Sequence, residues 1–197
     1  MPNSYQDLKI TFLKKFALGQ KTNLRNSEQV IKKCIALAYK DMMTAGKYYL
    51  EADLGKGNCE KTQKNKEREE RFYTLLCAKE FVFSPALIDE VCALFADTEK
   101  IENAKGYVTA FGLAQKLVNM TYKYLFVFSN EIGRTVDFSR CDCPLDSIII
   151  GKLGRGDIWS KLDRTSYDDL QRQIDACARE YPEYPHLGRL AYDFKNW

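Results

Sequence analysis

Apolar residues recur along most of the chain with the spacing of an amphipathic helix, about 3.6 positions. No run of alternating apolar and polar residues bounded by hairpin turns interrupts this pattern, so we predict an all-α fold. The first clear helix is expected after Asn26, a favourable N-cap residue followed by Gln29 at the capping-box position. Its buried face is expected to comprise Val30, Ile31, Cys34, Ile35, Ala38, Tyr39 and Met42.

Local start and stop signals predict the remaining helices. Serine is a good N-cap residue and proline fits the first helical position, so Ser84 followed by Pro85 is typical of a helix start. The charged stretch 54–70 is expected to form a solvated connection that becomes a helix before the apolar group around Phe72. Further helices are expected over about 99–110 with an end near Gly112, over about 113–128, from Pro144 onward, from Ser166 to about Arg179, and after Pro185.

Composition agrees with a folded, soluble protein. Of the 197 residues, 45% are hydrophobic and 29% are charged, and this length suits a single domain with a substantial core. The N-terminal stretch MPNSYQDLKITFLKKF lacks the continuous apolar segment of a signal peptide. The apolar run YLFVF at 124–128 is too short to cross a bilayer. We therefore expect a cytoplasmic protein that makes no membrane contact.

The charge distribution permits a nucleic-acid partner without arguing for one, since the net charge is only +3. The stretch KLGRGDIWSKLDR at 152–164 concentrates four basic residues around glycines and a tryptophan, namely Lys152, Arg155, Lys161 and Arg164. Such a loop is suited to contact phosphate groups, and an ordinary solvated surface loop explains the same residues. The sequence leaves both interpretations open.

Two neighbouring cysteines, Cys141 and Cys143, raise the question of a metal site. A structural zinc site needs a second ligand pair at a recognisable spacing, and the chain offers only His186 and Cys177, which do not provide one. The odd number of cysteines, seven, also does not suggest a disulfide framework in a chain of this size. We expect no metal or other cofactor, and we interpret Cys143 as the N-cap of the helix that Pro144 opens.

Lys116 is a candidate for chemistry on the helix predicted over 113–128. It shares a stripe with Asn119 and Lys123, opposite the apolar face. Near a helix start, the dipole and partial desolvation favour the neutral amine that a lysine nucleophile needs. The alternative is that Lys116 lies at the edge of the core with its charged end in water.

Asp146 is a candidate on the helix that Pro144 opens, where we expect it at the third helical position. An aspartate there complements the helix dipole, which explains the residue without any function. A carboxylate held at a helix start also stays ionised and fixed in direction, which suits a group that orients a nucleophile or stabilises positive charge.

Taken together, GLAQKLVNM and CPLDSIIIGKL resemble the central motifs of the helix-hairpin-helix DNA glycosylase superfamily, most closely its archaeal-type 8-oxoguanine branch. The resemblance covers roughly residues 99–155. In that family a lysine follows the hairpin glycine at a helix start, and Pro-x-Asp opens a later helix. The family's usual Leu-Pro-Gly-x-Gly hairpin is missing, and only Gly112 stands in its place.

The resemblance implies a helical glycosylase fold, duplex DNA as the partner, Lys116 as the nucleophile and Asp146 as the catalytic aspartate. It implies a glycosylase/lyase that flips a damaged or modified base out of the duplex and releases it through a Schiff base. Candidate contacts to the substrate are Gly112, Gln115, Asn119 and the aromatic residues Phe111, Trp159 and Trp197, with Lys152, Arg155 and Lys161 as candidates for phosphate. The alternative is a non-catalytic helical module that binds nucleic acid or another protein.

Overall fold

The structure, a computed structural model, describes residues 26–52, 58–96, 108–178 and 187–196. Every regular element within these ranges is helical, which confirms the all-α prediction. The elements in chain order are α2 (Ser27–Ala52), α3 (Asn58–Ala78), α4 (Pro85–Cys92), the short 3₁₀ helix η1 (Ala93–Phe95), α5 (Ala110–Val127), η2 (Phe138–Arg140), α6 (Ser147–Lys152), η3 (Trp159–Lys161), α7 (Arg164–Ala178) and α8 (Leu190–Asn196).

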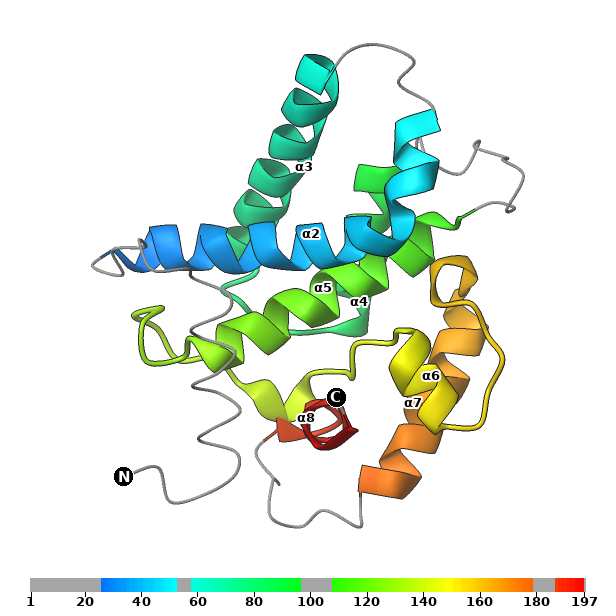
Figure 1. The fold of residues 1–197 in the computed structure, drawn as a ribbon. Helices are drawn as coiled ribbons and strands as arrows, with labels where there is room; N and C mark the ends of the chain where they lie inside the picture. The colour runs from blue at the N-terminus through cyan, green and yellow to red at the C-terminus, as the bar shows by residue number, and fades with distance from the viewer. Residues whose placement is uncertain (1–25, 53–57, 97–107, 179–186, 197) are drawn as a thin grey trace.

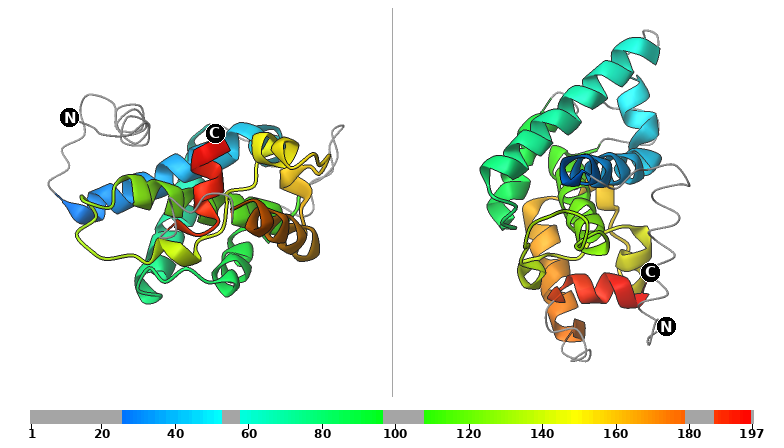
Figure 2. Two further views of the ribbon diagram at one scale, coloured as in Figure 1. Left: turned by 90° about the horizontal axis from the view of Figure 1, so that it is seen from below. Right: turned by 90° about the vertical axis from the view of Figure 1, so that its left-hand side faces the viewer.

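α5 crosses the middle of the molecule (Figure 1). α2 and α4 pack against α5, and α3 packs on α2. In the view of Figure 1, α6, α7 and α8 lie below these helices, and Figure 2 shows the same grouping from two other sides. η3 contacts α5, and α8 contacts both α6 and α7. The chain therefore surrounds α5 with helices from both its N-terminal and its C-terminal half.

This arrangement buries α5 on every side. All residues from 112 to 125 are buried, including the polar stripe of Lys116, Asn119 and Lys123. The sequence predicted one apolar face and placed this stripe opposite to it. The stripe is covered because polar groups of the C-terminal half of the chain pack against it, with an aspartate beside each lysine and a tyrosine hydroxyl that accepts from the Asn119 amide.

Two predicted helix starts are confirmed. Asn26 caps α2, since its Oδ1 accepts the N–H of Glu28 at 2.9 Å, and the seven predicted core residues of this helix are all buried. Ser84 caps α4, where its Oγ accepts the N–H of Leu87 at 3.3 Å and Pro85 occupies the first helical position. These side chains satisfy N–H groups that a helix start otherwise leaves without partners.

The structure differs from two predicted boundaries, in the stretch 54–70 and near Gly112. α3 begins at Asn58, so most of the expected solvated connection 54–70 is already helical, with Arg68 buried and its Nε donating to Leu94 O at 2.9 Å. The helix expected over 99–110 falls largely outside the described residues. Its expected end near Gly112 is wrong, because α5 begins at Ala110 with Thr109 as its N-cap.

The helix predicted from Pro144 begins at Ser147 instead. Asp146 is its N-cap rather than its third residue, and Oδ1 accepts the N–H groups of Ile148 and Ile149, both at 3.0 Å. Cys143 therefore does not cap the helix as predicted. The preceding residues stay extended because side chains from other helices bond to their backbone.

The C-terminal elements lie close to their predicted positions. α7 begins at Arg164, slightly before the predicted start, and α8 begins at Leu190. Gly188 precedes α8 with φ of +53°, and a Cβ there would overlap the carbonyl oxygen of Ser139. Within the described ranges, no helix combines the length and the apolar character required to cross a membrane.

Candidate active site

The structure brings Lys116 and Asp146 together. Lys116 Nζ lies 3.0 Å from Asp146 Oδ2, although the two residues are 30 positions apart in the sequence. Lys116 projects from α5 and Asp146 from the start of α6. Their side chains are 6% and 19% exposed, so the pair is largely enclosed and its carboxylate is the more accessible member.

Asp146 is held ionised by its surroundings. Burial by itself would raise the pKa of this carboxyl group. The positive charge of Lys116, the hydrogen bond from the Ile149 N–H, the hydrogen bond from Lys116 and the charge of Lys123 outweigh burial and hold the pKa below its usual value. The pair is thus an ammonium group beside a carboxylate that is fixed by its role as a helix cap.

Lys116 lies farther along its helix than the sequence indicated. Because α5 begins at Ala110, Lys116 falls in the second turn, beyond the turn in which the helix dipole acts strongly. Asp146 is therefore the group that acts on the amine directly. The ring of Trp159 lies on another side, with its centroid 5.9 Å from Nζ, within the range of a cation–π contact.

Gly112 explains how Trp159 reaches this position. A Cβ at Gly112 would lie 2.7 Å from the carbonyl carbon and oxygen of Ser160 and 2.8 Å from the carbonyl oxygen of Trp159. Only glycine lets η3 approach α5 this closely. Thr109 ties the same two elements together, since its N–H donates to Ser160 O at 2.9 Å. This close approach occurs within a helix, and Gly112 does not adopt a left-handed conformation.

Gln115 and Asn119 lie behind the pair, within the protein. Both side chains are fully buried. Gln115 Nε2 donates to Leu145 O at 3.2 Å, and Asn119 Nδ2 donates to the hydroxyl of Tyr167 at 2.9 Å. The structure thus places these two predicted substrate contacts where they hold neighbouring parts of the chain.

The predicted aromatic residues divide into three cases. Trp159 borders Lys116, as described above. Phe111 is half-buried, and its ring contacts both the guanidinium of Arg164, 4.8 Å from the ring centroid, and the ring of Tyr167, whose centroid is 5.4 Å away. Trp197 lies outside the described residues. Of the two that the structure describes, Trp159 is the one that lies against the Lys116 amine.

The three basic residues proposed to contact phosphate also differ. Lys152 is exposed at the end of α6. Arg155 already binds two carboxylates, with Nε 3.0 Å from Asp157 Oδ2 and a terminal nitrogen 2.8 Å from Asp169 Oδ2. Lys161 is half-buried at the end of η3. Lys152 is thus the most accessible of the three cations.

The sequence interpretation missed a set of buried polar residues beside the pair. Asp142 is buried, and it accepts hydrogen bonds from the Tyr167 hydroxyl at 2.7 Å and from Arg189 at 2.6 Å. Burial raises the pKa of Asp142, although the hydrogen bond from Tyr167 and the charge of Arg189 oppose that rise. Gln171 lies on the same face of α7 as Tyr167 and is also buried. The sequence offered one signal for this set: Tyr167 and Gln171, two polar residues four positions apart, lie on the apolar face of an amphipathic helix.

Neither cysteine of the 141–143 stretch has metal-binding partners in the described part of the chain. Cys141 and Cys143 are buried free cysteines, and burial raises the pKa of both thiols well above its usual value. Among the described residues no three His, Cys, Asp or Glu side chains are arranged to hold a metal ion. His186 lies outside these residues.

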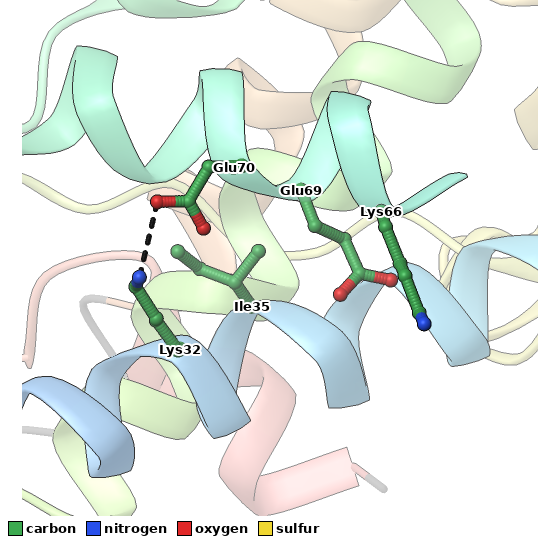
Figure 3. A pocket seen from close by; sticks show the side chains of 5 residues that line it. All are labelled: Lys32, Ile35, Lys66, Glu69 and Glu70. Carbon is green, nitrogen blue, oxygen red and sulfur yellow. Dashed lines mark hydrogen bonds and ion pairs between the residues drawn. The ribbon is translucent and has the colours of Figure 1, made fainter. Parts of the chain in front are cut away.

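A separate cavity of about 230 Å³ lies between α2 and α3 (Figure 3). Lys32, Ile35, Lys66, Glu69 and Glu70 line it, and Lys32 Nζ lies 3.0 Å from Glu70 Oε1. Burial raises the pKa of Glu69 against the charge of Lys66. The four charged side chains of this lining are exposed or half-buried on helix surfaces, so the enclosed pair of Lys116 and Asp146 remains the stronger candidate for chemistry.

Comparisons of the chain with protein-family models, with curated proteins and with solved structures give no significant match. An inference about function therefore has to start from the enclosed lysine–aspartate pair and the groups that surround it.

Proposed function

We propose that the chain is a lysine-dependent DNA glycosylase/lyase, with a helix-hairpin-helix glycosylase-like fold, that removes a damaged or modified base from duplex DNA. The observation that carries the proposal is the 3.0 Å contact between Lys116 Nζ and Asp146 Oδ2 in a largely enclosed site. A lysine nucleophile needs an adjacent group that accepts its proton, and Asp146 provides one. The two short motifs that resemble the glycosylases contain the same two residues.

The enclosure of the pair bears on how a substrate reaches it. With 6% of its side chain exposed, Lys116 lies too deep to meet a nucleotide stacked within a duplex. A nucleotide rotated out of the helix presents its sugar and base separately from the duplex, which is how enzymes that act on bases gain access. Trp159, which is buried beside the amine, then forms one wall of the site around Lys116.

The chemistry begins with proton transfer from the Lys116 ammonium to Asp146. The free amine forms a bond to C1′ of the deoxyribose while the bond between C1′ and the base nitrogen breaks, and the base leaves with that electron pair. The sugar ring then opens at the bond between C1′ and O4′, and C1′ becomes doubly bonded to Nζ as a Schiff base. Water then takes a proton from C2′, the bond between C3′ and O3′ breaks, and the 3′ phosphate leaves with that electron pair, which cleaves the strand. Hydrolysis of the Schiff base by a second water molecule frees the Lys116 amine.

Up to the Schiff base, the protons balance without an external reagent. Of the three protons on the ammonium group, one neutralises the departing base, one goes to O4′ and one stays on the Schiff-base nitrogen. Asp146 takes up and returns a proton, so it ends the sequence as a carboxylate. While ionised, it also stabilises the positive charge that develops on the sugar.

Borohydride trapping tests this proposal directly. A duplex with a single abasic site presents the C1′ aldehyde without requiring knowledge of the base, and a panel of duplexes with oxidised, alkylated and deaminated bases tests base release. The wild-type protein is expected to form a covalent adduct that Lys116→Gln loses. Lys79→Gln serves as the matched control, because Lys79 also pairs with a carboxylate, Glu90 at 2.7 Å, but on the protein surface.

The controls separate loss of chemistry from loss of structure. Circular dichroism has to show that Lys116→Gln is folded, and Lys79→Gln has to trap as the wild type does. Equal trapping by wild type and Lys116→Gln would overturn the proposal, as would absence of any adduct or released base across the panel. Salt-dependent duplex binding without either product would instead favour a non-catalytic nucleic-acid module.

A further inference from the structure

The segment that leads into Asp146 is extended and completely buried. Residues 141–145 form no helix, and all are buried. A buried backbone of this kind needs hydrogen-bond partners, and side chains from α5 and α7 supply them. Gln171 bonds to both backbone groups of Cys143, accepting its N–H at 3.2 Å and donating to its carbonyl at 2.7 Å. Gln115 holds the carbonyl of Leu145, immediately before Asp146.

The same segment is anchored at Asp142. The hydroxyl of Tyr167 donates to Asp142 Oδ2 and accepts from Asn119 Nδ2, so it connects the segment to α5. Asn119 Oδ1 is buried and has no hydrogen-bond partner among the described residues. An unpaired buried acceptor disfavours folding, so this amide is held in place by its other bonds at some cost to stability.

These contacts form one polar clamp, consisting of Gln115, Asn119, Asp142, Tyr167 and Gln171. The clamp reaches both members of the pair. Gln115 and Asn119 lie on α5 directly beside Lys116, and Gln115 also holds the residue before Asp146. The position of the carboxylate relative to the amine thus depends on the clamp as well as on the helix cap.

We propose that the polar clamp positions Asp146 against Lys116, with Gln171 as its principal positioning residue. This inference rests on the proposed function, because it assigns the clamp to the lysine chemistry described above. Gln171 fixes the segment from α7, an element that contributes neither member of the pair. A loosened segment lets the carboxylate move relative to the amine, and displacements of about 1 Å at reacting groups can cost on the order of 100-fold in rate.

Gln171→Met tests the inference, since methionine keeps the length of the side chain and removes both bonds to Cys143. In single-turnover reactions on the abasic duplex, the rate constant for strand cleavage is expected to fall on the order of 10- to 100-fold, while DNA affinity stays unchanged. Gln173→Met is the matched control, because Gln173 lies on the same helix and bonds to Asp169 instead. Tyr167→Phe removes the hydroxyl that connects Asp142 with Asn119 and is expected to change the rate in the same direction.

A second readout does not require catalysis. The ¹³C signal of the Asp146 carboxyl carbon reports its titration, and Gln171→Met is expected to raise the midpoint toward that of an ordinary aspartate, whereas Gln173→Met leaves it unchanged. If folded Gln171→Met keeps the wild-type rate constant for strand cleavage and the wild-type titration midpoint of Asp146, the proposed role of the clamp is overturned while the proposed function stays intact. An inactive wild type would overturn the proposed function, and the catalytic role of the clamp with it. The titration midpoint of Asp146 in Gln171→Met and Gln173→Met would then still show whether the clamp holds Asp146 against Lys116.

Discussion

The two oxygens of Asp146 accept hydrogen bonds from two different helices. Lys116 Nζ lies 3.0 Å from Oδ2, whereas Oδ1 accepts the backbone N–H groups at the start of α6. One carboxylate therefore caps α6 and pairs with α5 at the same time. Because the cap fixes the carboxylate, the ion pair needs less additional ordering of the Asp146 side chain than a pair on the surface would.

Asp146→Asn separates the charge of this residue from its role as a helix cap, because the asparagine oxygen can still accept the backbone N–H groups. The pKa of Asp146 is lowered in the folded state, so its ionised form stabilises the fold above the ordinary aspartate pKa. That contribution, about 1–2 kcal/mol, is expected to disappear as pH falls below about 4 and through the lowered pKa. Urea unfolding of both proteins from neutral to acidic pH measures it, and a difference that does not vary with pH would contradict the prediction.

Lys152→Gln and Arg155→Gln are expected to affect duplex binding differently. Each phosphate contact contributes about 0.9 to the slope of log affinity against log salt concentration. Lys152 is exposed, so its loss should reduce the slope by about that amount. Arg155 is already paired with Asp157 and Asp169, so its loss should leave the slope nearly unchanged. Fluorescence anisotropy over a range of salt concentrations measures the slope for both variants. A larger change of slope in Arg155→Gln than in Lys152→Gln would mean that Arg155, and not Lys152, contacts phosphate.

Gly112→Ala and Gly151→Ala form a matched pair, because both glycines lie in helices. At Gly112 the new Cβ would meet the backbone of η3 at 2.7 Å, so we expect destabilisation by about 1–3 kcal/mol. At Gly151 no atom lies within 4 Å of the new Cβ, and the better helix propensity of alanine should stabilise by about 0.5–1 kcal/mol. Chemical denaturation gives both values. Equal effects of the two changes would mean that η3 does not pack against α5 as described.

Lys123 and Asp193 form a buried ion pair. The change in stability on substitution should depend on whether one partner or both are replaced. Nζ lies 2.7 Å from Oδ2 and both side chains are almost fully buried, but the contact lacks hydrogen-bond geometry. Lys123→Met leaves a buried carboxylate without its partner cation and is expected to destabilise the protein by about 3–5 kcal/mol. The double variant K123M/D193L should recover most of that loss, which thermal and urea unfolding can measure. A double variant no more stable than the single one would count against this account.

Sequence patterns predicted the elements whose signals are local. α2 and α4 carry their caps and their apolar spacing within a few residues, so their starts and buried faces could be identified. The start of α6 could not, because the choice between capping at Cys143 and capping at Asp146 depends on Gln171 and other side chains distant in the sequence. The polar clamp was missed for the same reason, since its bonds between different elements join residues that are 24 to 48 positions apart.

The candidate pair was identified from the sequence, but its surroundings were not. Lys116 and Asp146 stood out through short motifs, and each had a plausible explanation without function. Their distance follows from how α5 and α6 pack, which no local pattern contains. The burial of Lys116 likewise depends on elements of the C-terminal half of the chain. A helical wheel alone therefore placed this lysine opposite the apolar face, on a side of the helix that is in fact buried.

The burial of α5 on every side limits how its sequence can evolve. An amphipathic helix such as α7 keeps one face on which most substitutions are neutral, whereas residues 112–125 offer no such face. Apolar positions there are constrained by packing, and polar positions by the partners that satisfy them. Accepted substitutions should therefore accumulate in the surrounding helices, and residues 112–125 should change more slowly than those helices do.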